Sequence, residues 1–233
     1  MLSPRRPGAN VDSEETSEVL DVHPPHEPVH GWRDFFLHLT IITIGLLIAL
    51  SLEGLVEWQH HRHLVHEAEA SMGAEIRANS QTVKRSLDEV RKQQGSLKQD
   101  ISVLKFIEKN KKAPKDAGLE ITFNISPLRN VSWLTAQSTG ALSYMPYGTA
   151  EEYADIYGTQ ALLDSAEQQA ARDAILAVGP LANVDDGAVD PTEGHAREMR
   201  EKVEVFEGQL LLVDSVLKGL DGSYTKFLAA HPE

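Results

Sequence analysis

A long apolar run near the N-terminus is the feature that most constrains what this chain can fold into. Residues 35–52 read FFLHLTIITIGLLIALSL and contain no formally charged side chain. A bilayer core of about 30 Å is crossed by about 20 apolar residues that rise about 1.5 Å each. Extension to residue 56 reaches that length and adds only Glu53 as a charge. Because core helices seldom stay uncharged this long, we expect one transmembrane helix over about residues 35–56.

Tryptophan flanks this run on both sides. Trp32 precedes it and Trp58 follows it, and as helix the two are separated by about 39 Å. That separation matches the hydrocarbon core plus its interfacial regions, where tryptophan rings prefer to lie. We therefore predict that Trp32 and Trp58 are interfacial anchors of a transmembrane segment over residues 32–58.

The flanking sequence predicts the topology. The run starts after a long polar stretch, exceeds the usual apolar region of a signal peptide and lacks a small-x-small cleavage site, so we interpret it as an uncleaved signal anchor. Arg5, Arg6 and Arg33 precede it, whereas Arg62 is the only arginine or lysine close behind. The positive-inside rule then predicts a single-pass inner-membrane protein with a cytoplasmic N-terminus and a periplasmic or other extracytoplasmic C-terminal domain.

The segments on either side of the membrane differ in character. Residues 1–31 are rich in proline and acidic residues, so we expect a disordered cytoplasmic tail. Residues 59–112 predict a long amphipathic helix of the coiled-coil type that continues the membrane helix to about Asn110. Its apolar positions follow a seven-residue pattern, with Ser80 and Gln94 as weak members: Ile76, Val83, Leu87, Val90, Leu97, Ile101 and Leu104.

The remainder of the extramembrane domain, residues 113–233, predicts further helices. Ile121, Phe123 and Ile125 alternate with polar residues and indicate a short extended segment first. Helix-capping patterns then predict helices at about 127–141, 150–178 and 191–229, with starts at Ser126-Pro127, Thr149 with Glu152, and Asp190-Pro191, and stops at Gly140, Gly179-Pro180 and near Leu228. The predicted fold class is all-α, with an antiparallel helical bundle outside the membrane.

Composition excludes several classes of function. The formal net charge is −13, and a nucleic-acid partner is not expected for such an acidic chain. There is no cysteine, which excludes disulfides, thiolate metal sites and cysteine nucleophiles. The sequence also lacks a nucleophile elbow, a phosphate-binding glycine loop, an H-E-x-x-H motif and a kinase signature. We therefore predict no enzyme, no catalytic residue and no cofactor.

A histidine cluster directly follows Trp58 and consists of His60, His61, His63 and His66. Glu57 and His60 have the Glu-x-x-His spacing of carboxylate-bridged metal sites, and His63 and Glu67 share a helix face. Glu57, His60, His63 and Glu67 are thus candidate metal ligands, although one helix supplies only two or three of them to one ion. The favoured interpretation is an interfacial belt of amphipathic rings at headgroup level.

One face of the apolar run carries its small and ionisable residues. His38, Gly45, Ala49 and Glu53 follow one another at spacings of seven, four and four. Gly45 and Ala49 form a small-xxx-small pair that lets two helices approach closely, so we predict a self-association face. The alternatives are a proton or ion relay through His38, or exposure of this face to lipid with no special role.

Two further groups have a structural and a functional interpretation. Asp185, Asp186 and Asp190 do not match a calcium-binding EF-hand loop, and a solvated loop is expected. The aromatic residues of the outer part favour core packing, with a ligand-contacting patch near the 141–149 turn as the alternative: Trp133, Tyr144, Tyr147, Tyr153 and Tyr157.

Several short motifs resemble a group of uncharacterised bacterial single-pass membrane proteins. They are W-R-D-F-F, TIITIGLLIAL, W-Q-H-H-R-H and E-I-R, followed by Trp133-Leu134, the run from Ser138 to Leu142, and Tyr153 with Tyr157. The resemblance covers roughly residues 30–160. It implies the single-pass topology and, because the group has no assigned activity, it implies no catalysis.

These observations favour one function and leave two alternatives. The favoured hypothesis is a membrane-anchored helical interaction or sensor-like module that self-associates in the bilayer or binds another membrane protein. The alternatives are a metal-binding or redox accessory protein that uses the histidine cluster, and a subunit of a larger membrane complex.

Overall fold

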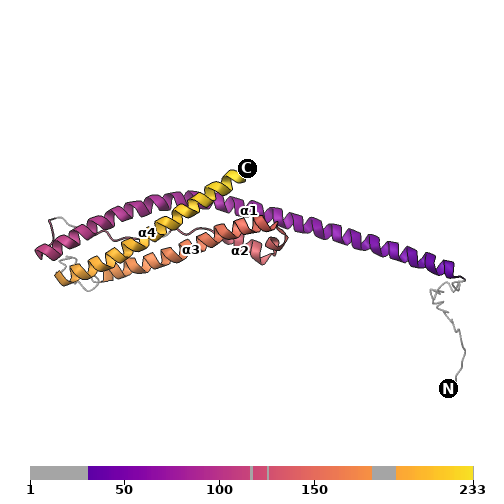
Figure 1. The fold of residues 1–233 in the computed structure, drawn as a ribbon, viewed down its shortest axis with the longest axis horizontal. Coiled ribbons are helices and arrows are strands. Elements are labelled where there is room, and N and C mark those ends of the chain that lie inside the picture. The colour runs from indigo at the N-terminus through magenta and orange to yellow at the C-terminus, as the bar shows by residue number, and fades with distance from the viewer. Residues whose placement is uncertain (1–30, 116–117, 125, 180–192, 233) are drawn as a thin grey trace, which may run out of the picture. The chain divides into compact units, whose positions relative to one another are not determined.

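The computed structural model describes residues 31–115, 118–124, 126–179 and 193–232, and within them the protein is all-helical, without a strand. The elements, in chain order, are α1 (Trp32–Asn110), α2 (Val131–Ser138), the 3₁₀ helix η1 (Ala141–Tyr144), α3 (Tyr147–Val178) and α4 (Glu193–Ala230) (Figure 1). The all-α prediction is confirmed. The predicted tail, the loop with Asp185, Asp186 and Asp190, and the Asp190-Pro191 helix start lie outside the described residues.

The chain divides into two compact units, Met1–Leu55 and Val56–Glu233, which are described separately. In the first unit, helix α1 contains a stretch that is long and apolar enough to cross a membrane. Its apolar side chains are exposed on every side, and no described residue covers them. Water is a poor solvent for so continuous an apolar surface, and an aqueous protein would bury it.

Helix α1 ends where the sequence predicts. Asn110 is its last residue, and its side-chain amide donates to the carbonyl of Phe106 at 2.9 Å. Lys111 then adopts the left-handed conformation with φ of 56°, and its N–H donates to the Ile107 carbonyl at 2.8 Å. A left-handed residue directly after a helix is the usual way to satisfy its last carbonyl groups.

The second unit is built on helix faces that repeat every seven residues. All seven apolar positions predicted in α1 are buried. Helix α4 buries a regular series at alternating spacings of three and four: Ala196, Met199, Val203, Phe206, Leu210, Val213, Leu217, Leu220, Tyr224 and Phe227. Helix α3 buries a comparable face that is rich in alanine, including Ala166, Ala170, Ala174 and Ala177. Small side chains let α3 and α4 lie close together.

Contacts between the helices give their directions. Helix α4 runs antiparallel to α3, since Tyr153 meets Phe227 near one end and Gln209 donates to the Ala166 carbonyl further along. It also runs antiparallel to α1, as the pairs Gln94–Leu210 and Glu108–Arg200 show. Helices α1 and α3 instead run parallel, because Tyr153 and Tyr157 contact Glu69 and Glu75 in the same order.

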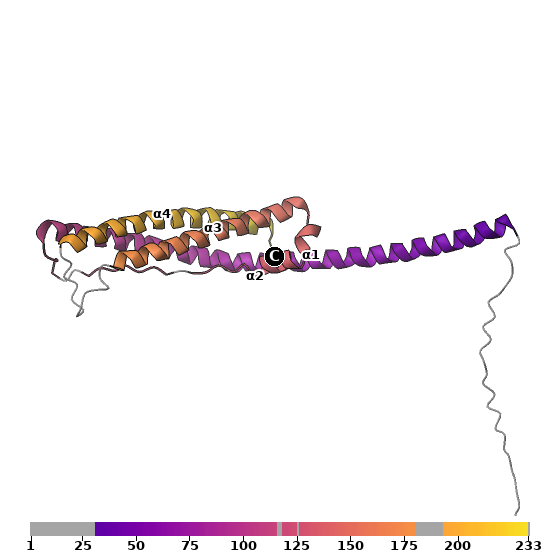
Figure 2. The ribbon, with the colours of Figure 1, turned by 90° about the horizontal axis from the view of Figure 1, so that it is seen from below.

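An extended stretch makes that parallel arrangement possible. We call residues 118–124 and 126–130 the return segment. It runs back along α1 from Asp100, near the C-terminal end of that helix, to Asn79, and α2 follows it (Figure 2). Leu119, Ile121 and Phe123 are partly buried and their neighbours are exposed, which confirms the predicted alternation; Ile125 is outside the described residues. The Phe123 ring packs edge-on against Phe206 of α4, with centroids 5.8 Å apart.

Two predicted helix starts are wrong. Ser126-Pro127 does not start a helix, because residues 126–130 form no regular secondary structure and α2 begins only at Val131. Helix α3 begins at Tyr147, and Thr149 therefore lies inside its first turn and is not the cap. The predicted stops are correct: Gly140 takes the left-handed conformation with φ of 76°, and α3 ends at Val178.

The seven-residue face of α4 predicts opposite responses at adjacent leucines. Leu210 is fully buried, so Leu210→Ala should lower the free energy of unfolding by about 2–5 kcal/mol through lost apolar burial and a cavity. Leu211 is 58% exposed, and Leu211→Ala should change it by less than about 1 kcal/mol. Denaturant unfolding of the full chain in detergent micelles, followed by circular dichroism, measures both. Equal losses in the two variants would contradict this packing.

Candidate functional site

Polar side chains within the apolar stretch of α1 are all satisfied by their own helix. The ring Nδ1 of His38 lies 2.7 Å from the Asp34 carbonyl, to which it donates when it carries the proton. The hydroxyls of Thr40, Thr43 and Ser51 each donate to the carbonyl four residues earlier. Such back-bonding is the arrangement that a helix needs where water is absent.

The predicted association face lies entirely on this exposed helix. His38, Gly45, Ala49 and Glu53 are all exposed, and a Cβ atom added at Gly45 would meet no atom within 4 Å. Gly45 thus has no packing role within one chain. Because a single chain cannot show a contact between two chains, the association face stays a prediction.

The predicted anchors Trp32 and Trp58 are 76% and 58% exposed. The Trp32 ring contacts Phe35 and Phe36, which groups three aromatic rings at the start of α1. The guanidinium of Arg62 lies over the Trp58 ring, 5.5 Å from its centroid.

The histidine cluster does not converge on one point. His63 Nε2 lies 3.1 Å from a Glu67 oxygen, in agreement with their shared face, whereas Glu57 lies 4.0 Å from His61. Among the described residues no ion pair joins Glu57 to His60, and no group of three His, Asp or Glu side chains could hold a metal ion. The metal site at Glu57, His60, His63 and Glu67 therefore stays a prediction that needs ligands from another chain.

The structure instead places part of the histidine cluster in a groove with Tyr144. The His61 ring stacks on the Tyr144 ring, with centroids 3.6 Å apart and planes at 14°. We call this the His61–Tyr144 groove; it has a volume of about 860 Å³ and is lined by Trp58, Gln59, His61, Arg62, His63, Val65, His66, Glu69 and Tyr144. His60 is not among its lining residues.

The predicted aromatic set divides into two groups. Trp133, Tyr153 and Tyr157 belong to the core, where the Trp133 and Tyr157 rings stack with centroids 5.1 Å apart. Tyr144 and Tyr147 are 50% and 82% exposed around the turn between η1 and α3. Core packing therefore describes the first group only.

A buried carboxylate joins α1, α2 and α3. Glu75 accepts hydrogen bonds from the Tyr157 hydroxyl at 2.8 Å and from the Ser132 backbone N–H at 3.1 Å. Burial, with the carboxylate of Glu75 as its acceptor, raises the pKa of Tyr157 well above its usual range. Burial also raises the pKa of Tyr153 to about 12, with a smaller contribution from nearby Glu69. Tyr157 is thus a fixed hydrogen-bond donor at any physiological pH.

Two further polar side chains are buried close to this carboxylate. The Tyr224 hydroxyl and the Gln160 amide have no hydrogen bond of ordinary geometry to a described protein atom. Burial raises the pKa of Tyr224, while the nearby amides of Asn79 and Gln160 oppose that shift.

A second stripe on α1, which the sequence pattern was not used to predict, is polar, and its first and last members bond to the return segment. We call Asn79, Ser86, Gln93 and Asp100 the polar seam; they recur every seven residues. The Asn79 side chain accepts from the Arg129 N–H at 2.9 Å and donates to the Arg129 carbonyl at 2.7 Å. An Asp100 oxygen accepts from the Glu120 N–H at 3.1 Å, and burial raises the pKa of Asp100. The seven-residue spacing of polar residues beside the apolar stripe was the available signal.

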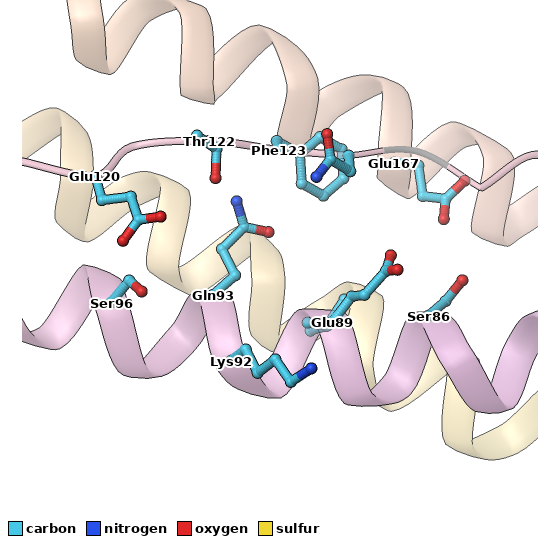
Figure 3. Close-up of a pocket in the computed structure, with 11 residues that line it drawn as sticks. Ser86, Glu89, Lys92, Gln93, Ser96, Glu120, Thr122, Phe123 and Glu167 are labelled. Carbon is cyan, nitrogen blue, oxygen red and sulfur yellow. The ribbon is translucent and has the colours of Figure 1, made fainter.

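Between these two attachments the return segment and α1 enclose a polar groove of about 190 Å³ (Figure 3). Ser86 and Gln93 line it from α1, Thr122 and Phe123 from the return segment, and Glu167 from α3. Glu167 is buried, and no hydrogen bond or ion pair joins it to a described residue. Its burial, together with the charge of Asp164, raises its pKa from 4.5 to about 7.

In comparisons with known proteins, no protein-family model, no curated protein and no solved structure matches the chain. The resemblance to bacterial single-pass membrane proteins therefore stays a prediction.

The Glu75 cluster predicts a difference between two tyrosines of α3. Tyr157→Phe removes a 2.8 Å hydrogen bond from a buried carboxylate and should lower the free energy of unfolding by about 1–3 kcal/mol. Tyr153→Phe removes only a 3.4 Å contact with the Glu69 carbonyl and should cost less. Unfolding curves of both variants measure the difference, and a larger loss in Tyr153→Phe would count against the cluster.

Glu167 predicts a pH-dependent stability. Because its pKa is higher in the folded state, its contribution is fully present below pH 4.5 and is lost as the pH rises through about 7. Glu167→Gln should therefore raise the free energy of unfolding by on the order of 2–3 kcal/mol at about pH 8 and hardly change it near pH 4. Glu151→Gln, at an exposed position of α3, is the control. A pH-independent difference between wild type and Glu167→Gln would refute the prediction.

Proposed function

We propose that this protein is a single-pass membrane-anchored helical interaction or sensor-like module that self-associates through its membrane helix. The observation that carries the proposal is the uncharged apolar stretch of α1 over residues 35–52. It is exposed on every side, and each of its polar side chains, His38, Thr40, Thr43 and Ser51, bonds to its own helix. Both properties suit a helix surrounded by lipid. The arginine distribution supports a cytoplasmic N-terminus.

In this proposal the second unit is an extramembrane bundle of three long helices. The repeating buried faces of α3, α4 and the outer part of α1 support it, since long helices with such faces are stable when they pack lengthwise. The bundle would present the His61–Tyr144 groove next in sequence to the membrane helix.

Self-association is supported by the geometry around Gly45. Gly45 and Ala49 are adjacent on one face and uncovered, so a second copy could approach the backbone closely there. His38 and Glu53 would lie at the two ends of that face as polar contacts.

Leucine substitution on opposite sides of the helix tests the proposal. Gly45→Leu should shift the monomer–dimer equilibrium toward monomer by about tenfold, because the added side chain holds the two backbones apart. Gly54→Leu is the matched control: Gly54 is equally open, and nine residues place it on the opposite side of the helix. Cross-linking in detergent and in liposomes at several protein-to-lipid ratios measures both.

The outcomes separate clearly. A dimer weakened by Gly45→Leu and unaffected by Gly54→Leu supports the predicted face. A wild-type chain that stays monomeric, or a dimer equally affected by both variants, would refute self-association through this face. Release of the wild-type chain from membranes by alkaline carbonate would refute the membrane anchor itself.

A further inference from the structure

The His61–Tyr144 groove is held in shape by contacts within the protein. Residues after the left-handed Gly140 form η1, whose Ala141 is fully buried, and this places Tyr144 against α1. The stacked Tyr144 ring covers His61, whose side chain is only 24% exposed. Because the groove is preformed, a ligand would not have to order it on binding.

Arg62 is oriented by a second contact. Its guanidinium lies over Trp58, one helical turn toward the N-terminus. Stacking on an aromatic ring leaves the N–H groups at the guanidinium edge available for an anion. The groove thus has one permanent cation in a defined position.

The other lining residues add hydrogen-bond donors. His61, His63 and His66 bring ring N–H groups, Gln59 an amide and Tyr144 a hydroxyl. Glu69 is the one carboxylate that lines the groove, while Glu57 and Glu67 lie outside it beside His61 and His63. In a chain with a formal net charge of −13, such a concentration of donors around an arginine favours a phosphate group.

The position in the chain identifies the source of that phosphate. Trp58, the first lining residue, follows the last residue of the predicted membrane helix by two positions. Lipid phosphates lie at that depth, where tryptophan rings also collect. We propose that the His61–Tyr144 groove binds the phosphate of an anionic phospholipid headgroup, with Arg62 as its principal ligand. This inference rests on the membrane anchor of the proposed function.

Lipid retention by the full chain tests the groove. Protein purified in a mild detergent is mixed with phosphatidylglycerol or phosphatidylcholine, and bound lipid is counted by native mass spectrometry. Wild type should retain phosphatidylglycerol in preference, since its phosphate carries no opposing choline cation. Arg62→Gln should reduce that retention about fivefold, the effect expected for one basic residue at the lipid surface.

Two control variants separate the groove from charge in general. Arg85→Gln removes the same charge from an exposed arginine of α1 that donates hydrogen bonds to Gln81 and Thr82 and does not line the groove. His60→Gln removes a histidine of the same cluster that does not line the groove. Both should retain phosphatidylglycerol as the wild type does. Equal retention of the two lipids by the wild type, or an equal loss in Arg62→Gln and Arg85→Gln, would overturn the proposal.

Competition and extraction distinguish the remaining possibilities. Bound phosphatidylglycerol that withstands excess inorganic phosphate supports a lipid site, whereas its displacement by phosphate would show a soluble anion site and overturn the lipid assignment. Alkaline carbonate extraction of the same wild-type membranes tests the anchor separately. A chain that resists extraction but shows no lipid preference would overturn the groove and leave the proposed function standing.

Discussion

The packing of the second unit depends on the hydrogen bonds that side chains of α1 make to the backbone of the return segment. The residues of the return segment are partly buried or exposed, and among the described residues no strand lies beside it to pair with its backbone N–H and C=O groups. Side chains of α1 take that role: Asn79 bonds to both backbone groups of Arg129, and Asp100 accepts from Glu120. Glu75 accepts from Ser132 just beyond the segment. These bonds offset the cost of burying polar side chains in α1, and they attach the end of the return segment and the first turn of α2 to that helix.

Local patterns in the sequence predicted those parts of the fold that depend on interactions between residues close together in the sequence. The uncharged run and the seven-residue stripe of α1 predicted a helix from the membrane segment to Asn110, and the helix has those bounds. Gly140 and Gly179 marked helix stops correctly, because a turn after a helix depends mainly on its own residues.

The wrong helix start and the groove that was not predicted have a common physical cause. Ser126-Pro127 is a good helix start in isolation, but the side chain of Asn79, about fifty positions away, bonds to both backbone groups of Arg129. A capping pattern depends only on neighbouring residues, so it could not predict a bond to a residue so distant in the sequence. In the same way, His61 and Tyr144 stood in two separate sequence groups, the histidine cluster and the outer aromatic residues. Contacts between distant positions define the groove, and spacing along the sequence could not reveal it.

Because the return segment is attached to α1 at two points, the helical stretch of α1 and the extended stretch of the return segment between those points must have the same length. Between Asn79 and Asp100 a helix rises about 31 Å, and between Glu120 and Arg129 an extended chain covers about 30 Å. One heptad inserted into α1 between those attachments would add about 10 Å, which the extended chain would match with about three residues and α3 and α4 with a heptad each. Insertions and deletions tolerated in this protein should therefore occur in sets with a ratio near seven to three. That ratio is a signature by which distant homologues with the same topology could be recognised.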